Sequence, residues 1–282
     1  MFSEAHQKFL DFLRSRKRAS ATIVAYGKDI NQLLTFISHL GKNDTGEVTQ
    51  EEIEAFLKKL QADGYTPKSI SRKINSIKTF YRFLKLNNFI KEDPSLLITH
   101  PKYEIKPPRI LSKLEYRALR DACRDDLRIS AVVELLLQTG IRISELANVQ
   151  LEDVADNVLK IRPQEGHAER EIPLNKSAKN ALDHYLSIRP KTDEKIVFIT
   201  KSGRPLLIRN IRTAIDRYFR LAGIKVAKVN DLRNTWIVYQ LISGANVVLV
   251  SKLAGHKRLS TTEKYLDLIK GNLEEPIKLG EL

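Results

Sequence analysis

A tyrosine, a histidine and two arginines occur in this chain in an order and at spacings that suit one kind of chemistry. Tyr265 follows His256 by nine residues, and two arginine-centred segments precede them, around Arg142 and Arg233. A phenol can act as a nucleophile, guanidinium groups can stabilise the charge of a crowded phosphorus centre, and an imidazole can shuttle protons. These groups can attack a phosphodiester without a metal ion or another cofactor. The pattern therefore predicts an enzyme that cuts and rejoins DNA.

The charge balance agrees with a nucleic-acid partner. The chain has 282 residues, with 48 Lys and Arg against 34 Asp and Glu, and a formal net charge of +14. Such a field attracts polyanions, although ribosomal and membrane-surface proteins can be equally basic. Charge alone does not decide among these classes, and the motifs make double-stranded DNA the expected partner.

A cytoplasmic location is also expected. The single cysteine, Cys123, has no second cysteine to pair with, and the first residues have neither the charged nor the apolar region of a secretion signal. No apolar run approaches the length of a membrane span, so no membrane association is predicted.

The first hundred residues have the pattern of a helical domain. Apolar residues recur at spacings of three and four, Thr49 is an N-cap candidate with acids in its first turn, and Pro67 stands where a helix tolerates proline. Between Thr66 and Lys91 basic residues alternate with apolar ones and no acid occurs, so a basic stripe is expected to face a phosphate backbone. A solvated helix face is the alternative, which the missing acids argue against. The predicted DNA contacts are Lys68, Arg72, Lys73, Lys78 and Arg82.

Prolines at 94, 101, 107 and 108 indicate a linker. We therefore expect a helical DNA-binding domain over residues 1–93, a linker over 94–109 and a catalytic domain over 110–282. Both domains are basic, so both can contact one duplex.

The second domain is predicted to be helical around a few short strands. Residues 127–137 have the composition of a buried helix that ends near Gly140. Residues 157–163 and 169–173 are expected to form two strands around a glycine turn, and residues 195–200 a further strand. The fold class is therefore mainly α with a small β-sheet.

With these motifs placed, the chain resembles tyrosine recombinases of the phage-integrase family, and Xer-type proteins in particular. The resemblance covers nearly the whole chain and is carried by Thr139-Gly-Ile-Arg-Ile-Ser-Glu-Leu146 and Leu253-Ala-Gly-His-Lys-Arg-Leu-Ser-Thr-Thr-Glu-Lys-Tyr-Leu266. It implies a helical SAM-like core-binding domain followed by a tyrosine-recombinase (DNA breaking-rejoining) catalytic domain. It also implies homodimers and tetramers on DNA, and it leaves open a second recombinase or an accessory protein as a partner.

The resemblance implies a role for each motif residue. Tyr265 would be the nucleophile that forms a 3′-phosphotyrosyl bond. Arg142 and Arg233 would grip the two non-bridging oxygens, which a planar fork of donors fits well. Glu145 would orient Arg142, and His256 would donate a hydrogen bond to the phosphate.

Two positions depart from the family pattern. The family has a lysine eight residues before the proline that closes the hairpin, and counting back from Pro173 gives Glu165. Asn230 stands where the family has a histidine, three residues before Arg233, and Asn234 stands where a further histidine is frequent. Asparagine can hydrogen-bond a phosphate oxygen but cannot take the tyrosine proton. General acids and bases each contribute about 100- to 10,000-fold, so an attenuated enzyme is expected.

Three other groups on the predicted hairpin are candidate substitutes for the missing lysine. They are Lys160, Arg162 and His167, and none occupies the expected position. Apolar residues also recur at near-helical spacing after Tyr265, and by resemblance this tail would dock on a neighbouring protomer.

Three function classes remain open at this point. They are a site-specific recombinase, a non-enzymatic DNA-binding protein on the recombinase fold, and an enzyme similar to type IB topoisomerases.

Overall fold

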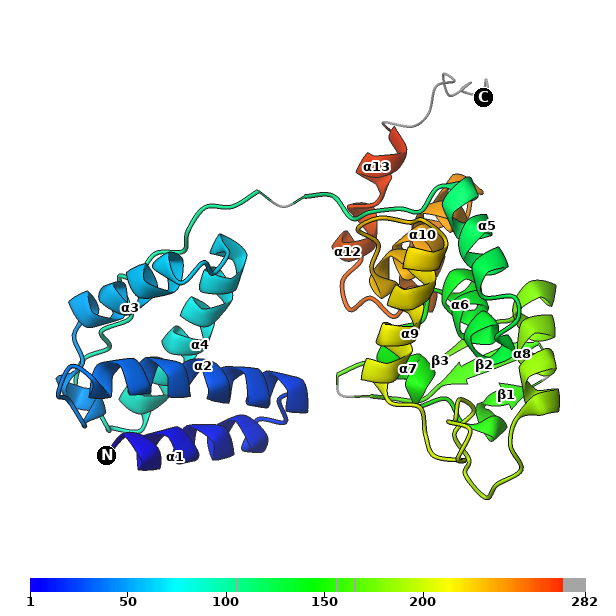
Figure 1. Ribbon diagram of the computed structural model, residues 1–282. Helices are drawn as coiled ribbons and strands as arrows, with labels where there is room; N and C mark the ends of the chain where they lie inside the picture. The colour runs from blue at the N-terminus through cyan, green and yellow to red at the C-terminus, as the bar shows by residue number, and fades with distance from the viewer. Residues whose placement is uncertain (105, 156, 165, 271–282) are drawn as a thin grey trace. The chain divides into compact units, whose positions relative to one another are not determined.

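The computed structural model describes residues 1–104, 106–155, 157–164 and 166–270. Glu165 and most of the tail predicted to dock on a neighbour lie outside these residues. Contacts divide the chain into two compact units, Met1–Lys106 and Pro107–Leu282, which are described separately (Figure 1). Ile98 lies in the core of the first unit, so part of the segment predicted as a linker packs there.

The first unit consists of α-helices around one apolar core. The helices are α1 (Phe2–Ser15), α2 (Ser20–Ser38), α3 (Gln50–Ala62) and α4 (Pro67–Leu86), with a short 3-10 turn η1 (Thr45–Glu47) before α3. Helix α3 begins with a capping box, in which the backbone N–H of Thr49 donates to Glu52 at 2.9 Å. The helical pattern expected for this half of the chain is confirmed.

A buried carboxylate ties α2 to α4. Asp29 on α2 is 2% exposed and accepts two hydrogen bonds from Arg72, at 2.5 and 2.9 Å. Lys73 donates to the same carboxylate at 2.9 Å and Ser76 at 2.8 Å. Lys73 is itself only 6% exposed, so its charge serves this internal contact.

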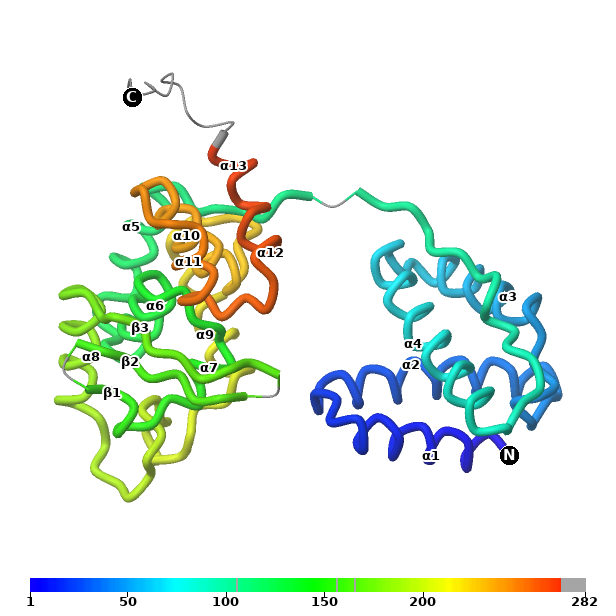
Figure 2. The backbone as a smooth tube through the Cα atoms, turned by 180° about the vertical axis from the view of Figure 1, so that it is seen from behind, coloured from blue at the N-terminus to red at the C-terminus, as the bar shows by residue number. Residues whose placement is uncertain are grey.

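The second unit surrounds a small antiparallel sheet with helices. Its elements are α5 (Lys113–Ala122), α6 (Leu127–Thr139), α7 (Ile143–Ala147), η2 (Leu151–Asp153), β1 (Val154–Ala155), β2 (Val158–Ile161), β3 (Arg170–Pro173), α8 (Lys176–Ile188), α9 (Ile208–Leu221), α10 (Val229–Ile242), α11 (Val247–Ala254), α12 (Ser260–Glu263) and α13 (Leu266–Lys270). The strand order is β1-β2-β3, and Leu159 pairs with Ile172. Helices α10 and α11 lie side by side (Figure 2). No helix among the described residues is long and apolar enough to cross a membrane.

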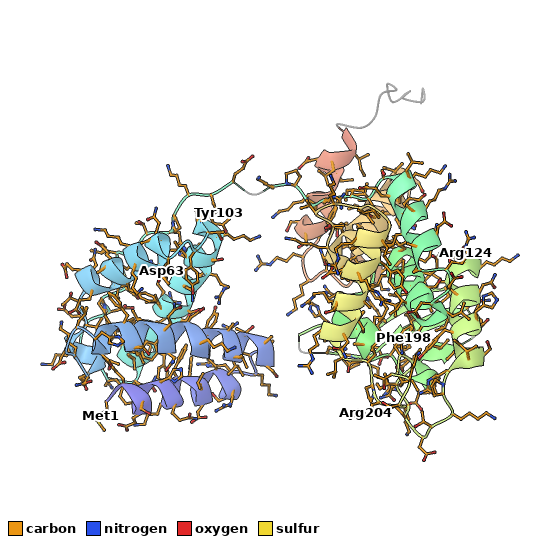
Figure 3. All side chains as sticks on the ribbon, viewed as in Figure 1. Met1, Asp63, Tyr103, Arg124, Phe198 and Arg204 are labelled. Carbon is orange, nitrogen blue, oxygen red and sulfur yellow. The ribbon has the colours of Figure 1, made fainter. Side chains whose placement is uncertain are left out.

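The prediction of a strand over residues 195–200 is wrong. Only isolated bridges form there, Ile196 with Gln150 and Ile199 with Pro205. Phe198, which is labelled in Figure 3, and both its neighbours are completely buried instead of alternating between two faces of a strand. Side chains also take the place of a ladder partner, because the Tyr185 hydroxyl donates to the Val197 carbonyl and accepts from the Ile199 N–H.

Helix α6 ends where the sequence indicated, at a glycine. Gly140 has φ 61°, in the left-handed region, and caps the helix. A Cβ at this position would lie 2.2 Å from the ring of Trp236 on α10. The glycine thus permits both the turn and the close approach of α10 to the segment that carries Arg142.

Replacing Asp29 with alanine should destabilise the first unit. Lys73 would remain buried without a counter-charge, so we expect the free energy of unfolding to fall by about 3 to 5 kcal/mol. Urea denaturation of the full chain, followed by far-UV circular dichroism, measures this loss. The fluorescence of Trp236, the single tryptophan of the chain, reports on the second unit and should not change.

Asp63→Ala provides the control for this comparison. Asp63 pairs with Lys59 at 2.9 Å, but the two side chains are 43% and 54% exposed. Its loss should cost less than about 1 kcal/mol. Equal destabilisation by the two substitutions would contradict the structural role given to Asp29.

Candidate active site

Two of the predicted site arginines meet at the C-terminal end of α11. Arg233 donates to the carbonyl of Ala254 at 2.6 Å and to that of Gly140 at 2.5 Å. Arg142, at the N-cap of α7, donates to Ala254 at 3.4 Å and to the carbonyl of Gly255 at 2.7 Å. The last carbonyls of a helix lack intrahelical partners and carry partial negative charge. They therefore hold the two guanidinium groups beside each other.

A third arginine, which the sequence analysis did not single out, completes this cluster. Arg170 on β3 donates two hydrogen bonds to Glu145, at 2.9 and 2.7 Å, and one to the carbonyl of Leu253 at 2.7 Å. Glu145 also binds the Arg142 side chain at 2.9 Å and its backbone N–H at 2.8 Å. One buried carboxylate thus orients two arginines.

Gly255 allows Arg170 to reach this position. Its φ of 67° lies in the left-handed region, and it caps α11. A Cβ here would lie 2.8 Å from Cζ of Arg170. Any side chain at position 255 would displace this guanidinium group.

The charges in this cluster shift one another's pKa values. Burial raises the pKa of Glu145, but the hydrogen bonds from Arg170 and from the backbone of Arg142 outweigh it and hold the pKa at about 2. Burial and the neighbouring charge of Arg142 lower the pKa of Arg233 to about 10. At neutral pH Glu145 is therefore ionised and Arg233 is protonated.

His256 and Tyr265 lie next to the arginines. Their rings are nearly parallel, with an interplanar angle of 11° and centroids 6.4 Å apart. The Nδ1 atom of His256 is 2.7 Å from the hydroxyl oxygen of Thr262, which fixes the orientation of the ring. Burial, followed by the charges of Arg233 and Arg142, lowers the pKa of His256 to about 4. The imidazole is therefore neutral at pH 7 in the free protein.

The tyrosine hydroxyl bonds to an asparagine. Tyr265 donates to Oδ1 of Asn234 at 2.9 Å, and Asn230 donates to the same oxygen at 3.1 Å. Burial raises the pKa of the Tyr265 phenol, and Arg233 partly opposes this shift. The direct contact with Tyr265 therefore belongs to Asn234 and not to Asn230, the asparagine three residues before Arg233. Neither amide can accept the phenol proton.

The candidate substitutes for the missing lysine differ in their surroundings. Lys160 pairs with Glu169 at 3.3 Å, and Arg162 binds both Asp153 and Glu152. Both charges are thus neutralised locally.

The third candidate, His167, lies near the cluster. Burial, followed by the charge of Arg142, lowers its pKa, and its Nδ1 atom is buried without a hydrogen-bond partner among the described residues. It lines a groove of about 850 Å³ together with Arg170, His256 and Lys257. Within the same described part of the chain, no group of three or more His, Cys, Asp or Glu side chains could hold a metal ion.

The predicted DNA contacts on α4 do not all point the same way. Lys68, Arg72 and Arg82 are exposed along one face of the helix, and Arg72 is also bound to Asp29. Lys78 is half-buried and donates to the carbonyl of Leu96 at 3.2 Å. Lys73 is buried against Asp29, so it presents no charge to a ligand in this conformation.

Arg170→Ala should destabilise the second unit by about 3 kcal/mol, because Glu145 would lose a buried bidentate partner. The midpoint of urea unfolding, followed by Trp236 fluorescence, should fall accordingly. Arg124→Ala is the matched control, since Arg124 is 76% exposed and its ion pair is with the exposed Asp121. An unchanged midpoint for Arg170→Ala would show that the buried pair adds nothing to stability.

Comparison with known proteins places this geometry in a family. Residues 109–271 match the phage integrase family, and residues 7–88 match the N-terminal SAM-like domain of phage integrases. Tyrosine recombinase XerC of Listeria welshimeri is 30% identical, over 95% of this chain and 94% of that protein. Tyrosine recombinase XerD of Oceanobacillus iheyensis is 31% identical, over 98% of this chain and 97% of that protein.

Solved structures share the fold. A crystal structure of XerA recombinase has a TM-score of 0.56 at 24% identity, covering 98% of this chain and 100% of that one. A lambda integrase dimer bound to a COC′ core site has a TM-score of 0.79 at 18% identity, covering 99% and 98%. A lambda integrase tetramer bound to a Holliday junction has a TM-score of 0.75 at 18% identity, covering 91% and 77%. The family match and the Xer identities confirm the resemblance seen in the motifs, and the chain belongs to the phage integrase family.

Proposed function

We propose that this protein is a site-specific recombinase that acts on DNA in the cytoplasm, with Tyr265 as its nucleophile. The observation that carries the proposal is the convergence of Arg142, Arg233 and His256 at the end of α11 with Tyr265. The Tyr265 ring is nearly parallel to that of His256, and its hydroxyl donates to Asn234 on α10. Few other reactions need a phenol together with a cluster of guanidinium groups.

The proposed reaction uses each group for a separate task. Arg142 and Arg233 bind the two non-bridging oxygens of the scissile phosphate and stabilise the charge of the pentacoordinate transition state. His256, which is neutral in the free protein, donates a hydrogen bond to the same phosphate. Tyr265 attacks phosphorus to form a 3′-phosphotyrosyl bond, which conserves the energy of the broken phosphodiester for religation.

Assembly follows from the same proposal. The lambda integrase structures of similar fold are a dimer on a core site and a tetramer on a Holliday junction. We extend these states to this protein, with both units on one duplex and the exposed face of α4, carrying Lys68, Arg72 and Arg82, toward the phosphate backbone. The tail beyond residue 270 is proposed to dock on the next protomer, and a second recombinase or an accessory protein remains a candidate partner.

Covalent capture tests the proposal directly. A duplex selected by the full chain from a random-sequence library, and then nicked near the centre of its site, should trap the protein as an adduct on denaturing electrophoresis. Tyr265→Phe should bind the same duplex and form no adduct, because it lacks the nucleophile.

Two other outcomes point to the alternative functions. Binding without an adduct by the unaltered protein would favour a non-enzymatic DNA-binding protein. Relaxation of supercoiled plasmid that lacks the selected site would favour an enzyme similar to type IB topoisomerases.

The asparagines beside Tyr265 predict an unusual pH dependence. The pKa of the phenol is raised and neither Asn230 nor Asn234 can take its proton, so the rate of adduct formation should rise between about pH 7 and 9 as more of the phenol ionises. Asn230→His should accelerate the reaction at pH 7 by about 100-fold or more and flatten the pH profile, since an imidazole can act as a base. Asn210→His, at an exposed position on α9, is the control. A rate of adduct formation that does not change with pH in the unaltered protein would contradict the prediction that Tyr265 lacks a base.

A further inference from the structure

Cleavage of a phosphodiester by a tyrosine leaves a 5′ oxygen that needs a proton. The pKa of an alcohol is far above neutrality, so expulsion of the bare alkoxide is slow and a positioned acid accelerates it. In this family a lysine in the hairpin turn would have this task, and the chain has Glu165 at that position. The assignment of a donor for this proton rests on the proposed function.

Several side chains in and near the arginine cluster can be excluded as the donor of this proton. The arginines of the cluster are fixed by hydrogen bonds to main-chain carbonyls and bind the phosphate as cations, a role for which they must keep their protons. His256 and His167 both have lowered pKa values, caused first by burial and then by the neighbouring arginines. Both imidazoles are therefore neutral in the free protein, and neither offers a readily lost proton.

The side chain of Lys257 reaches the turn between β2 and β3, next to Gly166. Lys257 directly follows His256, beyond the end of α11, and its Nζ lies 2.6 Å from the point that a Cβ of Gly166 would occupy. Gly166 has φ 79° and follows position 165 in the turn between β2 and β3. The side chain of Lys257 is exposed and forms no hydrogen bond or ion pair with another residue in the described part of the chain.

Lys257 lies between the turn and the proposed catalytic residues. It lines one groove with His256, His167 and Arg170, and its backbone is adjacent to the histidine that bonds to Thr262. By contrast, Lys160 and Arg162 are engaged in ion pairs with acids at a separate hollow.

We infer that Lys257 is the catalytic acid that protonates the leaving 5′ oxygen. The Tyr265 oxygen forms a bond to phosphorus while the bond from phosphorus to the 5′ oxygen breaks, and its electron pair stays on that oxygen. The ammonium of Lys257 gives this oxygen one proton and becomes a neutral amine, and the phenol proton leaves to solvent water. Religation reverses these transfers, with the amine of Lys257 accepting the proton of the attacking 5′ hydroxyl.

The test compares two forms of the nicked duplex selected by the full chain. One carries the natural 5′ oxygen at the scissile position, and the other carries sulfur there, which leaves without a proton. Lys257→Ala should lower the rate of adduct formation on the oxygen substrate by about 100- to 10,000-fold and have no comparable effect on the sulfur substrate. Lys257→Arg should show the same selective loss, because arginine keeps the charge but does not give up a proton.

Lys252→Ala is the matched control, since Lys252 is also exposed and precedes Lys257 by five residues. It should leave the ratio of the oxygen rate to the sulfur rate unchanged. An equal loss on both substrates for Lys257→Ala, or full activity of Lys257→Arg on the oxygen substrate, would overturn the inference and leave the proposed function standing. Absence of adducts from the unaltered protein on both substrates would overturn the proposed function and the inference together.

Discussion

Three guanidinium groups of like charge converge on the end of one short helix, and the second unit must offset their mutual repulsion. The carbonyls that end α11 accept hydrogen bonds from Arg142, Arg170 and Arg233. Within the described part of the chain, Glu145 is the acidic side chain bound to Arg142 and Arg170. Because Glu145 keeps its pKa at about 2, its charge persists throughout the physiological range. Removing this carboxylate would leave buried cations opposed only by partial charges.

The close packing around the cluster depends on small residues at its corners. Gly140 lets the Trp236 ring lie against the end of α6, and Gly255 makes room for Arg170 at the end of α11. Both glycines also adopt left-handed backbone angles that end their helices. The same two positions thus terminate helices and set how closely the arginines approach. A substitution at either one would combine backbone strain with a steric clash.

Local patterns predicted much of the fold, and distant contacts account for what they missed. The N-cap at Thr49 and the helix end at Gly140 rest on local residue types and are visible in the sequence. Lys73 lies on the buried face because it is three residues after Ile70 and one before Ile74, so periodicity would have placed it correctly. Arg170 shares the buried face of β3 with Ile172, a signal that alternation also contains. The bond from Tyr265 to Asn234 joins residues 31 apart and depends on tertiary packing, so no local pattern could reveal it.

The arginine donors are already immobilised before any ligand arrives. Both terminal nitrogens of Arg233 donate to main-chain carbonyls. Of the two terminal nitrogens of Arg142, one donates to Glu145 and the other to the carbonyl of Gly255 at the end of α11. Ordering a long side chain on binding ordinarily costs conformational entropy, about 0.5 to 1.5 kcal/mol for each one immobilised. In this protein the side chains of Arg142 and Arg233 are already ordered in the folded state, so their remaining N–H groups point in fixed directions. The cluster is therefore preorganised, and under the proposed function its rigidity as well as its charge selects a correctly placed anion.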